Sequence, residues 1–111
     1  MEKFIVLFLA PTAVIQEWMK TPQAEREAAE KKMREDWDAW MAVHTSMIKE
    51  TNAGGKTKKV TVDGVTDTKN DIMLYSIIEA ESHDVAANAY IGHPHLSIPQ
   101  ASIEVMAIRG M

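Results

Sequence analysis

Two stretches of the chain carry apolar side chains at both odd and even positions. They are residues 4–9 (Phe-Ile-Val-Leu-Phe-Leu) and residues 72–79 (Ile-Met-Leu-Tyr-Ser-Ile-Ile-Glu). Successive side chains of a strand point to opposite faces, so this pattern indicates strands whose two faces are both covered. We predict that both stretches are central strands of a sheet.

Two other stretches complete the predicted set of strands. Residues 57–62 are strand-like but contain Lys58 and Lys59, charges that discourage further pairing at a sheet edge. They lead into Asp63-Gly64, a frequent hairpin sequence, although the polar residues that follow allow a longer connection. The last strand is predicted over residues 102–109, with one face formed by Ile103, Val105 and Ala107.

Helical spacing of apolar residues replaces the strand pattern after residue 10. A short amphipathic helix is indicated by Val14, Ile15, Trp18 and Met19. Thr21-Pro22 interrupts it, and we expect Thr21 to cap a second helix with Pro22 at its first position. This helix is predicted over residues 22–49, followed by a loop at 52–55. Its buried stripe is formed by Ala29, Met33, Trp37, Trp40, His44 and Met47. Near the C-terminus, Ser82 is suited to cap a third, short helix that Gly92 and Pro94 end.

The predicted order β-α-β-β-α-β is that of the ferredoxin-like α+β fold. Its helices cover one face of a four-stranded antiparallel sheet, and nothing in the chain covers the other face. The two central strands are apolar on both faces, so a monomer would expose a large apolar patch. We therefore expect a homodimer in which two sheets pack through their open faces as a dimeric α/β barrel.

Composition bounds the class of protein. The 111 residues, 46% of them hydrophobic, suit one domain over residues 1–111. A net charge of −4 argues against nucleic-acid binding, and the lack of cysteine excludes disulfides and thiolate chemistry. No stretch approaches the ~20 apolar residues that span a bilayer, and the apolar run at residues 4–10 is better explained as a buried strand than as a signal peptide. We expect a cytoplasmic protein.

With this architecture, the chain resembles the YCII-related (DGPF-domain) family of the dimeric α/β-barrel superfamily. Besides the apolar first strand and the long helix, the matching features are Asp63-Gly64, Asp67-Thr68-Lys69, Tyr75, Glu79, His93-Pro94 and Glu104-Val105. The family's Asp-Gly-Pro-Phe reads Asp-Gly-Val-Thr at residues 63–66, and no histidine precedes His44, where some relatives use an early His for acid–base chemistry. The resemblance implies the fold, dimerisation and a small-molecule pocket.

Three histidines are the candidates for chemistry. In an extended backbone His93 and His95 would point to the same side, about 6.5 Å apart, and could converge on a ligand. Alternatively, His93 closes the preceding helix and His95 is exposed. His44 follows Trp40 by one turn and suits either a general base facing a pocket or a core histidine with one hydrogen bond.

Aromatic and acidic residues are the candidates for substrate binding. Trp37, Trp40 and Tyr75 are possible pocket walls, and Trp18 is suited to a mobile lid because its helix is short. Asp67 with Lys69 could orient an anionic group of the ligand. Core packing explains the aromatic residues as well, and loop solvation explains Asp67 and Lys69 equally well.

We therefore predict a small apolar or aromatic ligand in a pocket between the long helix and the sheet. Catalysis, if present, would be a histidine-based isomerisation or elimination, which requires no cofactor and no metal. Two alternatives are a non-catalytic dimeric interaction module and a cofactor-independent oxygenase.

Overall fold

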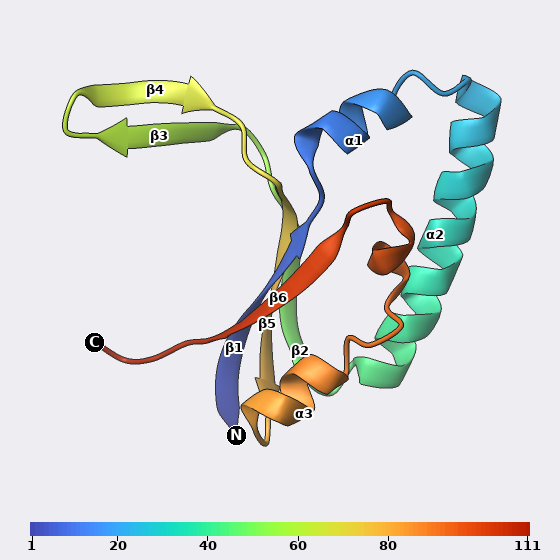
Figure 1. Ribbon diagram of the computed structural model, residues 1–111. Coiled ribbons are helices and arrows are strands. Elements are labelled where there is room, and N and C mark those ends of the chain that lie inside the picture. Colours follow the sequence, from blue (N-terminus) through green and yellow to red (C-terminus); the bar gives the residue numbers. More distant parts are fainter.

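The computed structural model describes all 111 residues (Figure 1). The strands are β1 (Glu2–Leu9), β2 (Ile48–Ala53), β3 (Thr57–Thr61), β4 (Gly64–Thr68), β5 (Ile72–Ala80) and β6 (Ser102–Ala107). The helices are α1 (Thr12–Trp18), α2 (Gln23–His44), α3 (His83–Asn88) and the 3-10 turn η1 (Pro94–Ser97).

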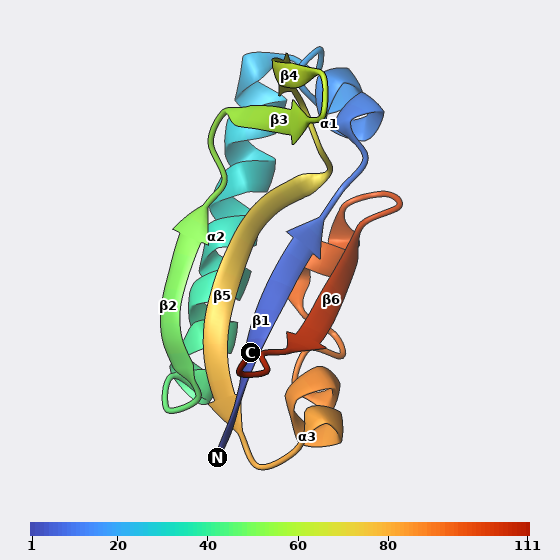
Figure 2. The ribbon, with the colours of Figure 1, turned by 90° about the vertical axis from the view of Figure 1, so that its left-hand side faces the viewer.

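Four strands form one antiparallel sheet in the order β2-β5-β1-β6 (Figure 2). The two strands predicted to be central, β1 and β5, are central, and Figure 1 shows the helices on one side of the sheet. This confirms the ferredoxin-like α+β fold. The short helix α1 and the strand β6 also lie where the sequence predicted them.

The core lies between the sheet and the helices. On β1, every second side chain is buried, and Phe4 pairs across the sheet with the equally buried Ile78 of β5. The buried apolar residues are Phe4, Val6, Phe8, Ile78, Ala80, Ala86 and Tyr90. Because alternate residues of a strand face opposite ways, Ile5 and Leu7 of β1 and their partners Ile77 and Tyr75 of β5 lie on the open face.

The prediction of a helix up to residue 49 was wrong. α2 ends at His44, a tight turn follows, and residues 48–53 form β2, the edge strand of the sheet. The backbone N–H of Glu79 donates to the Met47 carbonyl at 2.9 Å, so pairing with β5 begins directly after the turn. The sequence pattern favours a continued helix here, because helix-forming residues are present and Gly and Pro are absent. In the folded chain, tertiary pairing with β5 outweighs this local propensity.

The strand predicted over residues 57–62 exists as β3, but it is not an edge of the four-stranded sheet. It pairs only with β4 in a separate two-stranded hairpin. The Asp63-Gly64 signal is confirmed: Thr61 pairs with Gly64 across a two-residue connection, and Gly64 adopts a φ of 125°, which favours glycine. The polar strand β4 was not predicted, because threonines and Asp67 resemble a loop composition.

Two details of the helices differ from the predictions. The N-cap of α2 is Pro22 without a side-chain cap, and Thr21 contributes instead its carbonyl, which accepts from Arg26 Nε at 3.1 Å. Ala29 is exposed, so the stripe of α2 meets the body only from Met33 onward. The cap of α3 is confirmed, because Ser82 Oγ accepts from the Val85 N–H at 3.1 Å.

Candidate functional site

The predicted stripe of α2 meets the C-terminal turn in a group of rings that we call the aromatic cluster. It consists of Phe8, Trp37, Trp40, Tyr90, His93 and His95. β1 supplies the phenyl ring, α2 supplies both indoles, and the segment after α3 supplies the others. The structure therefore brings four of the predicted site residues together, with His44 at the rim.

Pro94 sets the path of the two buried histidines. It begins the turn η1, so the backbone is not extended through His95 as predicted, yet both rings still enter the same cluster. His93 Nδ1 accepts from the His95 backbone N–H at 3.0 Å, and His95 Nε2 donates to the Leu9 carbonyl at 2.9 Å. Because Nδ1 of His93 is an acceptor, its neutral ring carries the proton on Nε2.

Two polar atoms in the cluster are buried without a hydrogen-bond partner. They are His93 Nε2 and the Tyr90 hydroxyl, and the two ring centroids lie 5.7 Å apart. The His93 ring meets the indoles of Trp37 and Trp40 edge-on, at 4.4 and 4.6 Å between centroids. A buried donor without a partner costs about 1–3 kcal/mol, so this arrangement is unfavourable unless something else binds there.

Burial keeps the polar groups of the cluster uncharged. It lowers the pKa of His93 to about 4, and His95 and His44 nearby lower it further. Burial also lowers the pKa of His95, against the opposing effect of backbone hydrogen bonds with Leu9 and Ser102. The same cause raises the pKa of Tyr90. At neutral pH the cluster thus offers neutral donors rather than cations.

His44 lies at the rim of the cluster, at the last residue of α2. Its ring stacks on Trp40 with centroids 4.0 Å apart and an interplanar angle of 17°, and its Nδ1 donates to the Trp40 carbonyl at 2.8 Å. Trp40 Nε1 in turn donates to the Ala89 carbonyl at 3.3 Å. The half-buried imidazole of His44 keeps Nε2 as a basic atom beside the indole.

Three predicted binding residues lie outside the cluster. Tyr75 stands on the open face of the sheet, where its hydroxyl accepts from Asn52 Nδ2 at 3.2 Å. Asp67 lies on the hairpin in an exposed ion pair with Lys58 at 2.6 Å. Trp18 is half-buried on α1. Tyr90, by contrast, was not among the predicted site residues, and its spacing of three from His93 is the one sequence signal that links the two.

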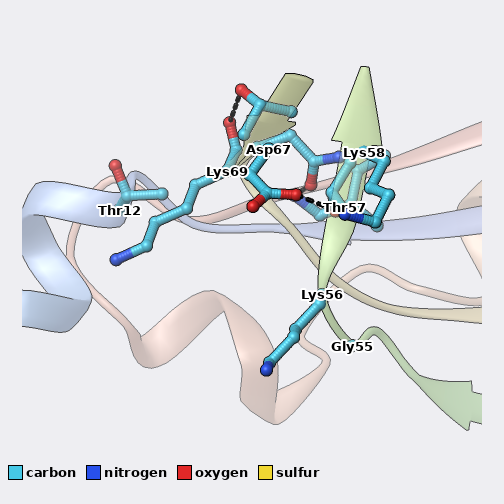
Figure 3. A pocket seen from close by; sticks show the side chains of 10 residues that line it. Thr12, Gly55, Lys56, Thr57, Lys58, Asp67 and Lys69 are labelled. Carbon is cyan, nitrogen blue, oxygen red and sulfur yellow. Dashed lines mark hydrogen bonds and ion pairs between the residues drawn. The ribbon is translucent and has the colours of Figure 1, made fainter. Parts of the chain in front are cut away.

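A surface hollow of about 1000 Å³ lies at the base of the hairpin (Figure 3). Lys56, Lys69 and the Lys58–Asp67 pair border it, together with Thr12 at the start of α1. A smaller hollow of about 190 Å³ beside it reaches Ala10 and Ile15. None of the three candidate histidines lines either hollow. Nor does any group of three histidine or acidic side chains come together that could hold a metal ion.

Comparison with known proteins gives one informative likeness. No family model matches the chain, and no curated protein matches it either. A similar solved structure is 5-chloro-2-hydroxyhydroquinone dehydrochlorinase from Burkholderia phenoliruptrix AC1100, in complex with 2,5-dihydroxybenzoquinone. The likeness covers 100% of this chain and 94% of the enzyme, with a TM-score of 0.52 and 16% identity. The chain shares the fold of this enzyme. Within the present chain, no helix combines the length and apolar character needed to cross a membrane.

Proposed function

We propose that the protein binds a small planar aromatic molecule at the aromatic cluster, between α2 and the sheet. The observation that carries this proposal is the pair of unpartnered buried polar atoms, His93 Nε2 and the Tyr90 hydroxyl, among indole and phenyl rings. A ligand with a ring and an oxygen would satisfy both atoms and pack on the indoles. α2 has no fully buried residue, so a small outward movement of this helix admits the ligand.

The chemistry that this site suits is proton transfer in an isomerisation or an elimination. His44 at the rim supplies the base, and His93 Nε2–H donates to the ligand oxygen that gains negative charge. His95 holds His93 in place through its backbone N–H. The shared fold supports this reaction class, because the similar enzyme is named for a dehydrochlorination and was solved with a planar hydroxyquinone.

The rival proposal is a dimeric interaction module without catalysis. It is favoured by the close packing of the cluster, since His93 and His95 are buried, with exposed fractions of 2% and 1%, and neither lines the two hollows beside the hairpin. In this case the rings would only stabilise the fold. A test must therefore separate a ligand-binding hydroxyl from a structural one.

We further propose that the protein is a homodimer and a member of the YCII-related family. The isolated chain exposes 7941 Å² of surface, whereas a compact monomer of its 12.4 kDa exposes roughly 6100 Å². The open face carries a continuous apolar set, Ile5, Leu7, Leu9, Met73, Tyr75, Ile77 and Met106. The chain therefore exposes about 1800 Å² more surface than a compact monomer would. If each of two copies buried this extra area, the interface would have the size found in obligate dimers.

The test of ligand binding uses Tyr90→Phe, which removes only the unpartnered hydroxyl. Calorimetric titration with 2,5-dihydroxybenzoquinone should show binding to the unmodified protein and about tenfold weaker binding to the variant, because one hydrogen bond is lost. The thermal midpoint of the free variant should be unchanged or higher. Thr45→Val, which removes an exposed hydroxyl at the end of α2, is the matched control. Equal affinities of both variants, or no binding at all across a panel of hydroquinones, would favour the interaction module.

A further inference from the structure

We propose that the hairpin β3–β4 is a dimerisation arm, which packs against a second copy of the chain. This proposal rests on the homodimer proposed above and adds a contact that the sheet faces alone do not supply. The arm comprises residues 56–69, which lie between β2 and β5.

The arm is attached to the body only at its base. β3 and β4 pair with each other and with no strand of the four-stranded sheet. A two-stranded hairpin alone is marginally stable in water, so it needs a further surface to pack on. The isolated chain is extended accordingly, with a radius of gyration of 15.8 Å against about 13 Å for a compact domain of this length.

The direction of the arm indicates what that surface is. Figure 1 shows the hairpin projecting on the side of the sheet opposite to the helices, which is the side of the open face. Whatever covers the open face therefore meets the arm as well. In a two-fold dimer each arm would lie along the body of the other copy, so that one interface accounts for both exposed features.

One face of the arm carries exposed valines at its tip and the Lys58–Asp67 ion pair nearer its base. Val60 and Val65 are a cross-strand pair, with exposed fractions of 75% and 62%, and Val62 beside them in the turn is fully exposed. The opposite face carries threonines and Lys59, which suits solvent. An amphipathic hairpin with exposed valines on one side is typical of a strand pair that is half-buried in its assembled state.

Charge also favours a second copy as the occupant. The arm contains four lysines and two aspartates and has a net charge of +2. Because the net charge of the whole chain is −4, the residues outside the arm have a net charge of −6. A positive arm is attracted to a negative body of the same sequence. Complementary potentials of this kind orient the two partners and raise the association rate.

The experiment measures the dimer dissociation constant by sedimentation at several protein concentrations. Val60→Asp/Val65→Asp should weaken the dimer at least 100-fold, because it replaces the two paired valines at the tip of the arm with two unpaired charges. Thr61→Asp/Thr66→Asp adds the same charge to the opposite face of the same hairpin and should change the constant less than threefold. Val60→Thr/Val65→Thr preserves strand propensity and should still weaken the dimer several-fold, which separates lost contacts from an unfolded hairpin.

The outcomes distinguish the arm from the homodimer itself. If the unmodified chain is a dimer and the valine variants dimerise as tightly as the threonine control, the arm proposal is overturned and the sheet interface stands. If the unmodified chain is a monomer at all concentrations tested, the homodimer fails and the arm fails with it.

Discussion

At the scale of single residues, His93 is held by contacts on several sides. Its Nδ1 caps η1, its ring fills the space between two indoles, and its Nε2 finds no partner. A histidine held in this way stays neutral, because charging it would bury an ion among rings. At neutral pH its Nε2 therefore carries a proton that it can donate, while its Nδ1 accepts from the His95 N–H.

The low pKa of His93 predicts a loss of stability in mild acid. The folded chain binds the proton near pH 4 and the unfolded chain near pH 6.5, so unfolding takes up a proton between these values. Stability is then fully present above about pH 6.5 and decreases as the pH falls toward 4, by roughly 1–2 kcal/mol between pH 7.5 and 5. Chemical denaturation at both pH values measures this difference.

The matched variant for this prediction is His93→Asn, because asparagine can still accept from the His95 N–H as an N-cap. It should reduce the pH dependence of the unfolding free energy, whatever its effect on the stability at pH 7.5. His83→Gln, which alters an exposed histidine, serves as the control. An unchanged pH dependence in His93→Asn would show that His93 is not the group that titrates.

The sequence predicted part of this site and could not predict the rest. Helical spacing placed Trp37, Trp40 and His44 on one stripe, because that periodicity is a local property of the chain. The unpartnered state of His93 and Tyr90 depends on what surrounds them after folding, which no local pattern encodes. Tyr75 was assigned to the same pocket, but strand alternation places it on the opposite face of the sheet.

At the scale of elements, the strands with two apolar faces were predictable, whereas the more polar strands β2 and β4 were not. β1 and β5 carry apolar side chains on both faces, and the helices cover only one of these faces. β2 is an edge strand with Lys49 and Glu50 exposed, so its sequence continues the amphipathic character of α2. Only pairing with β5 determines that the chain turns after His44.

The side-chain cap predicted for α3 is present, whereas the one predicted for α2 is absent. The cap of α3 gives a testable prediction. Ser82→Ala should lower the unfolding free energy by about 1 kcal/mol, because the N–H of Val85 loses its acceptor at the first turn. Urea denaturation at neutral pH measures this change. The control is Ser46→Ala, an exposed serine outside any helix cap, which should change stability by less than about 0.5 kcal/mol. Equal effects of the two substitutions would contradict the role of the cap.

At the scale of the whole molecule, three features of the surface favour the proposed dimer. Its helices cover one face of the sheet, the second face is apolar, and a hairpin extends beyond that face (Figures 1 and 2). Only 11 of the 111 residues are buried, which leaves little core for a domain of this length to be stable alone. A second copy on the open face explains all of these features together.

The most direct test of this account is the mass of the native protein in solution at micromolar concentration. Native mass spectrometry should show a particle of twice the 12.4 kDa chain mass, which also reveals any retained small molecule as added mass. A particle of 12.4 kDa at all concentrations would contradict the account, because the apolar face of the sheet would then be exposed to water in the stable protein.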